Sequence, residues 1–159
     1  MSGTFRRNAG VVVFNSAGKV LLCLRNDVAN AWQFPQGGIE EGETPAQAAK
    51  RELKEETSLE NVTLVKTLTD GVRYCFPENI LLSMQKRGFK NIGQEMFWSL
   101  FYFSGNESEI NLHTAEPEFS SYRWGSMQEA YDLIVEFKKE AYKKALAEFA
   151  PLIAEYIVK

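Results

Sequence analysis

The stretch from Gly37 to Leu59 reads GGIEEGETPAQAAKRELKEETSL. Three of its carboxylates, Glu52, Glu55 and Glu56, recur at helical spacing, which places them on one face of a helix about one turn long. Like charges this close repel one another, and a proton or a bound cation relieves the repulsion. Mg²⁺ typically takes a few carboxylates together with the phosphates of a substrate. The stretch therefore predicts a metal platform for a polyphosphate.

The same stretch carries the local signals of a helix over Pro45–Thr57. Thr44 is a good N-cap, the proline after it suits the first helical position, and Gln47 can complete a capping box with Thr44. Arg51 lies one turn before Glu55 and can reach back to Glu43. Taken alone, the helix has an alternative interpretation as a solvated acidic surface, in which basic residues separate the glutamates.

The composition fits one compact enzyme domain that spans residues 1–159. Hydrophobic residues make up 45% of the chain and charged residues 25%, which is ordinary for a soluble globular protein. The net charge of −3 argues against bulk attraction to nucleic acid but allows local basic patches. With no leader-like segment and no long apolar run, we expect neither secretion nor membrane insertion. Cys23 and Cys75 lack metal-ligand spacing, which indicates reduced thiols in the cytoplasm.

Hydrophobic patterns along the chain alternate between strand and helix, and the turn residues Asn15–Gly18 predict a hairpin. The segment Pro77–Gly93 is polar and basic, with room for a helical turn. The expected fold class is α+β, a mixed β-sheet sandwiched between the glutamate helix and C-terminal helices. The expected strands are Ala9–Phe14, Val20–Leu24, Val62–Leu68, Val72–Phe76, Met96–Phe103 and Tyr122–Trp124. The expected C-terminal helices are Met127–Val135 and one that starts near Lys138, buries Tyr142, Ala145, Leu146 and Phe149, and ends or kinks at Pro151.

Two sets of residues carry a family resemblance. Residues 37–59 follow the spacing G-x5-E-x7-R-E-L-x-E-E-x-S-L and resemble the Nudix box, with Ser58 where the family usually has a left-handed capping glycine. The loop Trp32–Gly38, WQFPQGG, is similar to that of one Nudix branch, the RNA pyrophosphohydrolases and plant-type diadenosine polyphosphate hydrolases. Other segments that resemble this branch are Arg6–Gly10, Gly93–Gln94, Glu109–Leu112, Pro117–Phe119 and Phe137–Lys139.

The resemblance implies the Nudix fold and the hydrolysis of a phosphoanhydride bond with divalent ions, Mg²⁺ or Mn²⁺ as its substitute. The residues that it implies as catalytic are Glu52, Glu55 and Glu56, with Glu56 or a neighbouring carboxylate as the general base. The metal ligands that it implies are the same three glutamates, the Gly37 carbonyl and Glu118. Without the matching motif, Glu118 reads as a solvated glutamate in a loop.

Substrate phosphates need cations, and bases need a stacking surface. The expected substrate-binding residues are Arg6, Arg7, Arg25, Gln36, Arg73 and Tyr74. Lys86, Arg87 and Lys90 add a basic rim or are solvated surface charges. His113 is the only histidine, so we expect neither a Ser-His-Asp mechanism nor a histidine-rich zinc site.

One departure from the branch concerns substrate preference. Met96 and Phe97 stand where the family usually has Gln-Lys, which removes a positive charge that the family brings to the substrate. The predicted function is a divalent-metal-dependent Nudix pyrophosphohydrolase that cleaves a nucleoside 5′-polyphosphate, either a 5′-triphosphorylated RNA end or a diadenosine polyphosphate, as a monomer or weak dimer. The alternative is a non-catalytic Nudix module that binds nucleotide or RNA. Such modules typically lose box glutamates, and none is lost here.

Overall fold

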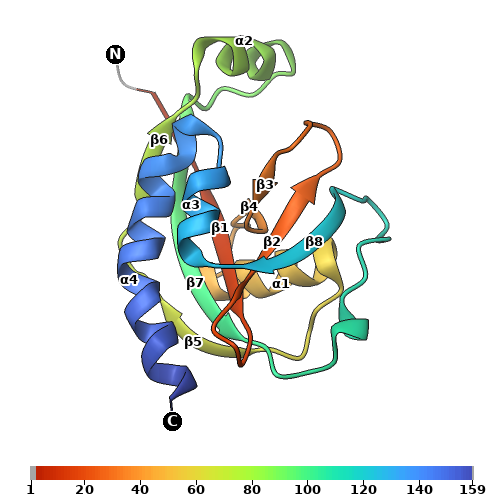
Figure 1. Cartoon of the computed structure of the whole chain (residues 1–159). Helices are drawn as coiled ribbons and strands as arrows, with labels where there is room; N and C mark the ends of the chain where they lie inside the picture. Colours follow the sequence, from red (N-terminus) through yellow and green to blue (C-terminus); the bar gives the residue numbers. More distant parts are fainter. Residues whose placement is uncertain (1–2, 159) are drawn as a thin grey trace.

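The computed structural model describes residues 3–158. In that range the elements alternate between strands and helices in the order expected from the sequence (Figure 1). They are β1 Phe5–Phe14, β2 Val20–Arg25, β3 Trp32–Gln33, β4 Gln36–Gly38, α1 Pro45–Thr57, β5 Thr63–Thr67, β6 Val72–Cys75, α2 Glu78–Lys86, β7 Gly93–Tyr102, η1 Glu107–Glu109, β8 Phe119–Gly125, α3 Met127–Leu133, η2 Glu136–Lys138 and α4 Lys139–Ile157.

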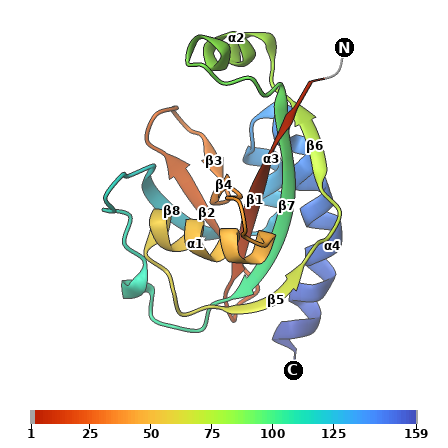
Figure 2. The same ribbon diagram turned by 180° about the vertical axis from the view of Figure 1, so that it is seen from behind.

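A mixed sheet is built around β1 and β7, which pair in parallel from Phe5 opposite Gly93 to Phe14 opposite Tyr102. The strands of the main path lie in the order β3-β2-β1-β7-β5, while β4 pairs with β1, β6 with β7 and β8 with β2. α1 covers one face of the sheet, and α3 and α4 cover the other (Figures 1 and 2). The α+β fold class and the sandwiched sheet are therefore confirmed.

The two faces of the sheet bury separate apolar clusters, because successive strand residues point to opposite sides. Val12 and Phe14 of β1 pack with Phe149 on the α4 face, whereas Val11 and Val13 pack with Leu53 on the α1 face. α1 is thus anchored by its apolar side, and its glutamates are held at a fixed place beside β4 and the start of β1.

Several elements differ from the expectation. β1 and β7 begin earlier than predicted, at Phe5 and Gly93, and the short strands β3 and β4 were not predicted. β8 runs from Phe119 to Gly125, longer than the predicted Tyr122–Trp124, because it pairs with β2 along that length. The segment Pro77–Gly93 contains a full helix, α2, in place of a single turn.

The prediction that Pro151 ends the last helix is wrong, since α4 continues to Ile157. Pro151 is exposed, so the carbonyl that its missing N–H leaves unpaired faces water. Phe149 and Ile153 are buried on either side of it and hold the helix against the sheet. No helix within residues 3–158 combines the length and apolar character needed to cross a bilayer.

Candidate active site

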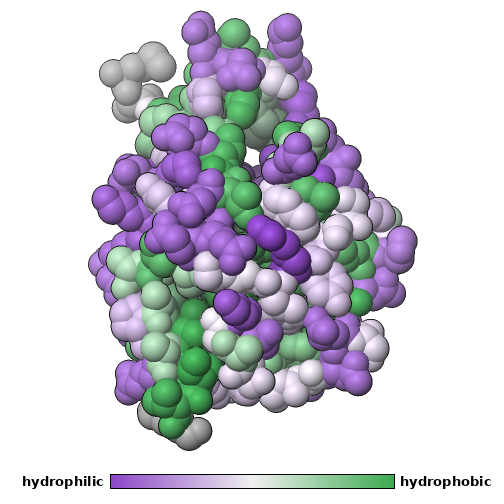
Figure 3. All heavy atoms as spheres, in the orientation of Figure 1, coloured by the Kyte–Doolittle hydropathy of each residue, from purple (hydrophilic) through white to green (hydrophobic). Residues whose placement is uncertain are grey.

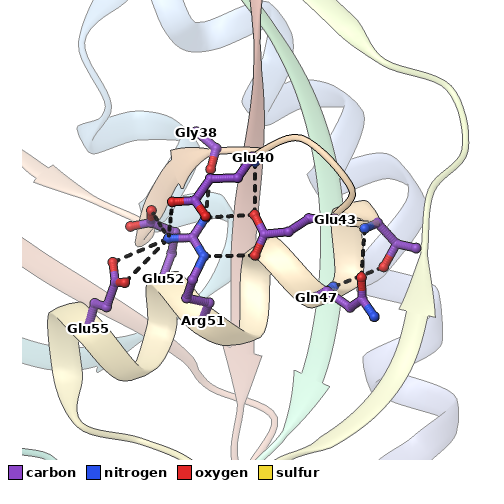
Figure 4. A network of polar contacts seen from close by, with 8 residues as sticks. Gly38, Glu40, Glu43, Gln47, Arg51, Glu52 and Glu55 are labelled. Carbon is purple, nitrogen blue, oxygen red and sulfur yellow. Dashed lines mark hydrogen bonds and ion pairs between the residues drawn. The ribbon is translucent and has the colours of Figure 1, made fainter.

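The loop before α1 and the first turns of the helix are held together by Arg51 (Figure 4). Its guanidinium donates to both carboxylate oxygens of Glu43, at 2.8 and 2.9 Å, and to the Gly38 carbonyl at 2.8 Å. The same group contacts Glu52 at 2.7 Å and Glu55 at 3.3 Å. The expected reach of Arg51 to Glu43 is confirmed, and the loop is thereby tied to the glutamate face of α1.

The charge of Arg51 also sets the state of Glu43. Its hydrogen bonds, together with the Glu40 backbone N–H, hold the pKa of Glu43 at about 2. Glu43 is therefore ionised and forms an ion pair with Arg51. The predicted capping box is formed by Thr44 and Gln47, and Ser58 takes the left-handed conformation with φ of 70°.

Glu56 has the most unusual environment of the cluster. The residue is 4% exposed, and neither carboxylate oxygen has a hydrogen-bond partner among the described residues. Burial first, and then the nearby charge of Glu118, raise the pKa of Glu56 to about 11. A buried carboxylate without a compensating charge is strongly unfavourable, so burial favours the protonated form of Glu56.

Glu118 reaches this cluster from the loop before β8. Asn26 fixes that loop through its backbone N–H to the Glu118 carbonyl at 3.0 Å and its side chain to the Pro117 carbonyl at 2.8 Å. The negative charge of Glu118 raises the pKa of both Glu56 and Glu52, and the three residues line the same cavity. For Glu52 the larger cause of the raised pKa is burial.

Gly37 is required by the fit between loop and helix. A Cβ atom at this position would lie 1.9 Å from the carboxyl carbon of Glu52. Only glycine lets the backbone approach that carboxylate so closely. The arrangement brings the main chain of residue 37 and the Glu52 side chain together as neighbouring oxygen donors.

These oxygen atoms have the chemistry that a hard divalent cation prefers. Among residues 3–158 no three acidic, histidine or cysteine side chains form a ready metal cluster. Arg51 instead draws Glu52 and Glu55 towards its guanidinium. Mg²⁺ and Mn²⁺ prefer oxygen ligands. The set supplies only oxygens, including the two Glu56 carboxylate oxygens that have no partner among the described residues and the carboxyl of nearby Glu118.

Two cavities meet at this cluster. The smaller, of about 530 Å³, is lined by Glu52, Glu55, Glu56 and Glu118 among others. The larger, of about 870 Å³, shares Glu52 and Glu118 with it and extends away under α2. Its basic lining residues are Arg6, Arg25, Arg87 and Lys138. The acidic centre therefore adjoins a cavity lined by four basic residues, of which Arg25 is ion-paired with Asp27 at 2.7 Å.

Lys138 is a cavity residue that the sequence interpretation did not assign, although the segment Phe137–Lys139 was part of the resemblance. It is 7% exposed, and its ammonium lies 3.5 Å from the Gln36 side-chain oxygen. Burial and the nearby Arg25 lower the pKa of Lys138 to about 8. Among the described residues no carboxylate lies within ion-pair distance of this ammonium, although the charge of Asp27 is near enough to act on it. A buried ammonium that faces a cavity is suited to an anionic ligand.

The structure separates the predicted substrate-binding residues into two groups. Arg6, Arg25 and Gln36 line the large cavity. Arg7 does not, because it alternates with Arg6 along β1 and faces the other side of the sheet, over the Phe97 ring. Arg73 is exposed and engaged by Glu95 at 3.2 Å and by the Phe5 ring.

Tyr74 also lies outside the cavity lining. It is 6% exposed, belongs to the core on the α4 face, and donates its hydroxyl to Gln94. Its ring is therefore not a surface on which a base can stack. Phe76, two residues further along, is the aromatic residue of this segment that lines the cavity.

The Met96-Phe97 departure is a packing change. Met96 is 1% exposed in the core, and Phe97 is half-buried beneath Arg7, away from the large cavity. The expectation that the missing lysine weakens contact with the substrate therefore loses its geometric basis.

Known proteins match this chain over most of its length. The family model for the NUDIX domain matches residues 4–149. The chain belongs to the Nudix family. An RNA pyrophosphohydrolase of Pelagibacter ubique is 41% identical over 139 residues, with 87% of each chain covered. Nudix hydrolase 26, chloroplastic, of Arabidopsis thaliana is 40% identical over 150 residues, covering 92% of this chain and 69% of the relative.

Solved structures agree on the fold. The dihydroneopterin triphosphate pyrophosphohydrolase of E. coli gives a TM-score of 0.66 at 21% identity, covering 89% of this chain and 96% of that one. A C. elegans Ap4A hydrolase gives a TM-score of 0.62 at 19% identity, covering 91% of this chain and 98% of that one. The protein is a Nudix hydrolase acting on pyrophosphate bonds, so the alternative of a non-catalytic module is not retained.

Proposed function

We propose that this Nudix hydrolase is a Mg²⁺-dependent RNA pyrophosphohydrolase that cleaves a phosphoanhydride bond at a 5′-triphosphorylated RNA end. The observation that carries the proposal is the junction of the two cavities at Glu52 and Glu118. A polyphosphate lying in the cationic cavity would bring one phosphoanhydride bond to the acidic centre. Relatives about 40% identical that are named RNA pyrophosphohydrolases support this substrate.

The residues that would hold the divalent ion are Glu52, Glu56 and Glu118, with the Gly37 carbonyl. When bound, such an ion neutralises charge on the phosphates and makes a nearby water more acidic. Binding would also replace the proton that the buried Glu56 carboxyl holds in the metal-free protein. Mn²⁺ has similar ligand preferences and is the expected substitute.

The remaining side chains position the substrate and take up a proton. Arg6, Arg25 and Lys138 would bind phosphate oxygens and stabilise the charge that grows during the reaction. The water oxygen bonds to phosphorus, the bridging P–O bond breaks, and the leaving phosphate keeps the electron pair. We assign the released proton to the Glu55 carboxylate, which is 57% exposed and lines the acidic cavity.

A diadenosine polyphosphate is the second candidate, since its phosphate chain would meet the same cations. The resemblance of the WQFPQGG loop includes hydrolases of this substrate class as well as RNA pyrophosphohydrolases. The test is a panel with Mg²⁺ that compares triphosphorylated RNA, diadenosine tetraphosphate and a nucleoside triphosphate, with products resolved. We expect the highest kcat/KM with RNA, and a higher value for either small substrate would contradict the assignment.

We also propose that the protein works in the cytoplasm. The support is that neither Cys23 nor Cys75 forms a disulfide in the structure, as expected in a reducing compartment. Thiol titration of protein isolated under alkylating conditions tests this, and an oxidised Cys75 would contradict it.

A further inference from the structure

α2 is a helix whose presence the core does not explain. None of its residues is buried. Figures 1 and 2 show it apart from the other helices, beyond the end of the sheet where β1 begins, and Figure 3 shows a hollow beneath it. A helix this short gains little stability without packing. Its contribution is therefore to be sought at the cavity that it borders.

One stripe of α2 and its cap faces that cavity. The residues of the stripe are Asn79, Ile80, Ser83, Met84 and Arg87. They recur three and four residues apart, which defines one helical face. The opposite face, with Leu82 at 50% exposure and Lys86, takes no part in the lining. α2 is therefore a wall of the substrate cavity, on the side away from α1.

The stripe combines apolar surface with one cation. Ile80 and Met84 are half-buried and offer flat contact to a base or ribose. Arg87 closes the helix, and no carboxylate among the described residues lies within ion-pair distance of its guanidinium, which instead lies 5.3 Å from the Phe89 ring centre. Val28, 46% exposed on the loop after β2, adds apolar surface to the same cavity.

We propose that this stripe binds the part of an RNA substrate that follows its first nucleotide, with Arg87 contacting a backbone phosphate and Ile80 and Met84 contacting a base. The inference rests on the proposed function and names the part of the site that selects RNA. A dinucleoside polyphosphate carries all its phosphates in one run, which the inner cations Arg6, Arg25 and Lys138 would occupy. Only a nucleic acid presents a further phosphate beyond a nucleoside to Arg87.

The test is binding of a fluorescent 5′-triphosphorylated RNA pentanucleotide in EDTA, measured by anisotropy over a range of salt. Arg87→Gln should weaken the Kd about five-fold or more and reduce the salt slope by about one. Lys86→Gln is the matched control, because it removes the same charge from the adjacent, non-lining position. Met84→Ser against Leu82→Ser provides the same comparison for apolar contact. Melting curves should be unchanged, since none of the four residues is buried.

The outcomes separate this inference from the proposed function. Equal effects of Arg87→Gln and Lys86→Gln, or an equal loss of affinity for ATP or diadenosine tetraphosphate, would overturn the role of the stripe even if RNA is hydrolysed. RNA that binds through Arg87 but is not hydrolysed with Mg²⁺ would uphold the stripe and overturn the proposed function. An RNA that does not bind at all would overturn both.

Discussion

Replacing Lys138 should make the protein more stable and its substrate binding weaker. Burial holds the pKa of Lys138 at about 8 against an ordinary 10.5. At about 1.4 kcal/mol per pKa unit, keeping this ammonium charged in the native state costs about 3 kcal/mol. Lys138→Met keeps the apolar stem and removes the charge, so we expect the free energy of unfolding at pH 7 to rise by up to that amount.

The pH dependence gives the sign of the effect. Because the native pKa is lowered, the folded protein loses the Lys138 proton near pH 8, while the unfolded chain keeps it up to about 10.5. The unfolded state binds more protons in that window, so this group makes the wild type more stable as pH rises. The advantage of Lys138→Met should therefore be largest below pH 8 and shrink towards pH 10.5.

Urea denaturation of both proteins at pH 7 and pH 10 measures this difference directly. Lys143→Met, at an exposed position of α4, is the matched control and should leave stability unchanged. In parallel, the KM of Lys138→Met for triphosphorylated RNA should rise about five-fold or more, for the loss of one charged contact. A variant that is less stable than wild type at pH 7, or that keeps its KM, would refute the reasoning.

Two other predictions concern the glutamate cluster, and a third concerns Phe97. Glu56→Gln should cut kcat by at least ~10² and reduce the rise in melting temperature that millimolar Mg²⁺ produces. The metal-free variant should stay folded, because Gln resembles the protonated carboxyl. Near-normal turnover would contradict a role for Glu56 in the site. Gly37→Ala should lower kcat in steady-state assays, since its Cβ meets the Glu52 carboxyl, and full activity would show that the loop can shift freely. Phe97→Lys should lower the melting temperature without improving KM, because Phe97 packs under Arg7 outside the cavity; an improved KM would restore the substrate role of this position.

The sequence was most informative where structure depends on nearby residues. The capping box of Thr44 and Gln47 and the left-handed Ser58 are local, and all are present. The face shared by Glu52 and Glu56 follows from helical period alone. Glu118 needed the family motif, because no local pattern links a loop glutamate to a helix more than fifty residues earlier.

The sidedness of the strands was not predictable in the same way. Arg6 and Arg7 are chemically equivalent in the sequence, and only the register of β1 against β7 turns one into the cavity and the other away. The pairing of β6 with β7 likewise turns the Tyr74 side chain into the core, which the sequence does not show. The role of Lys138 depends on its burial, which in turn depends on how η2 packs near Arg25 and Gln36 and cannot be read from the sequence.

The most direct test of the account is product-resolved hydrolysis of a 5′-triphosphorylated RNA oligonucleotide by wild type and Glu56→Gln, each with Mg²⁺ and with EDTA. We expect conversion to monophosphorylated RNA by wild type with Mg²⁺, none in EDTA, and at least ~10²-fold slower conversion by the variant. Undiminished hydrolysis in EDTA, or no conversion of the RNA by wild type with Mg²⁺, would contradict it.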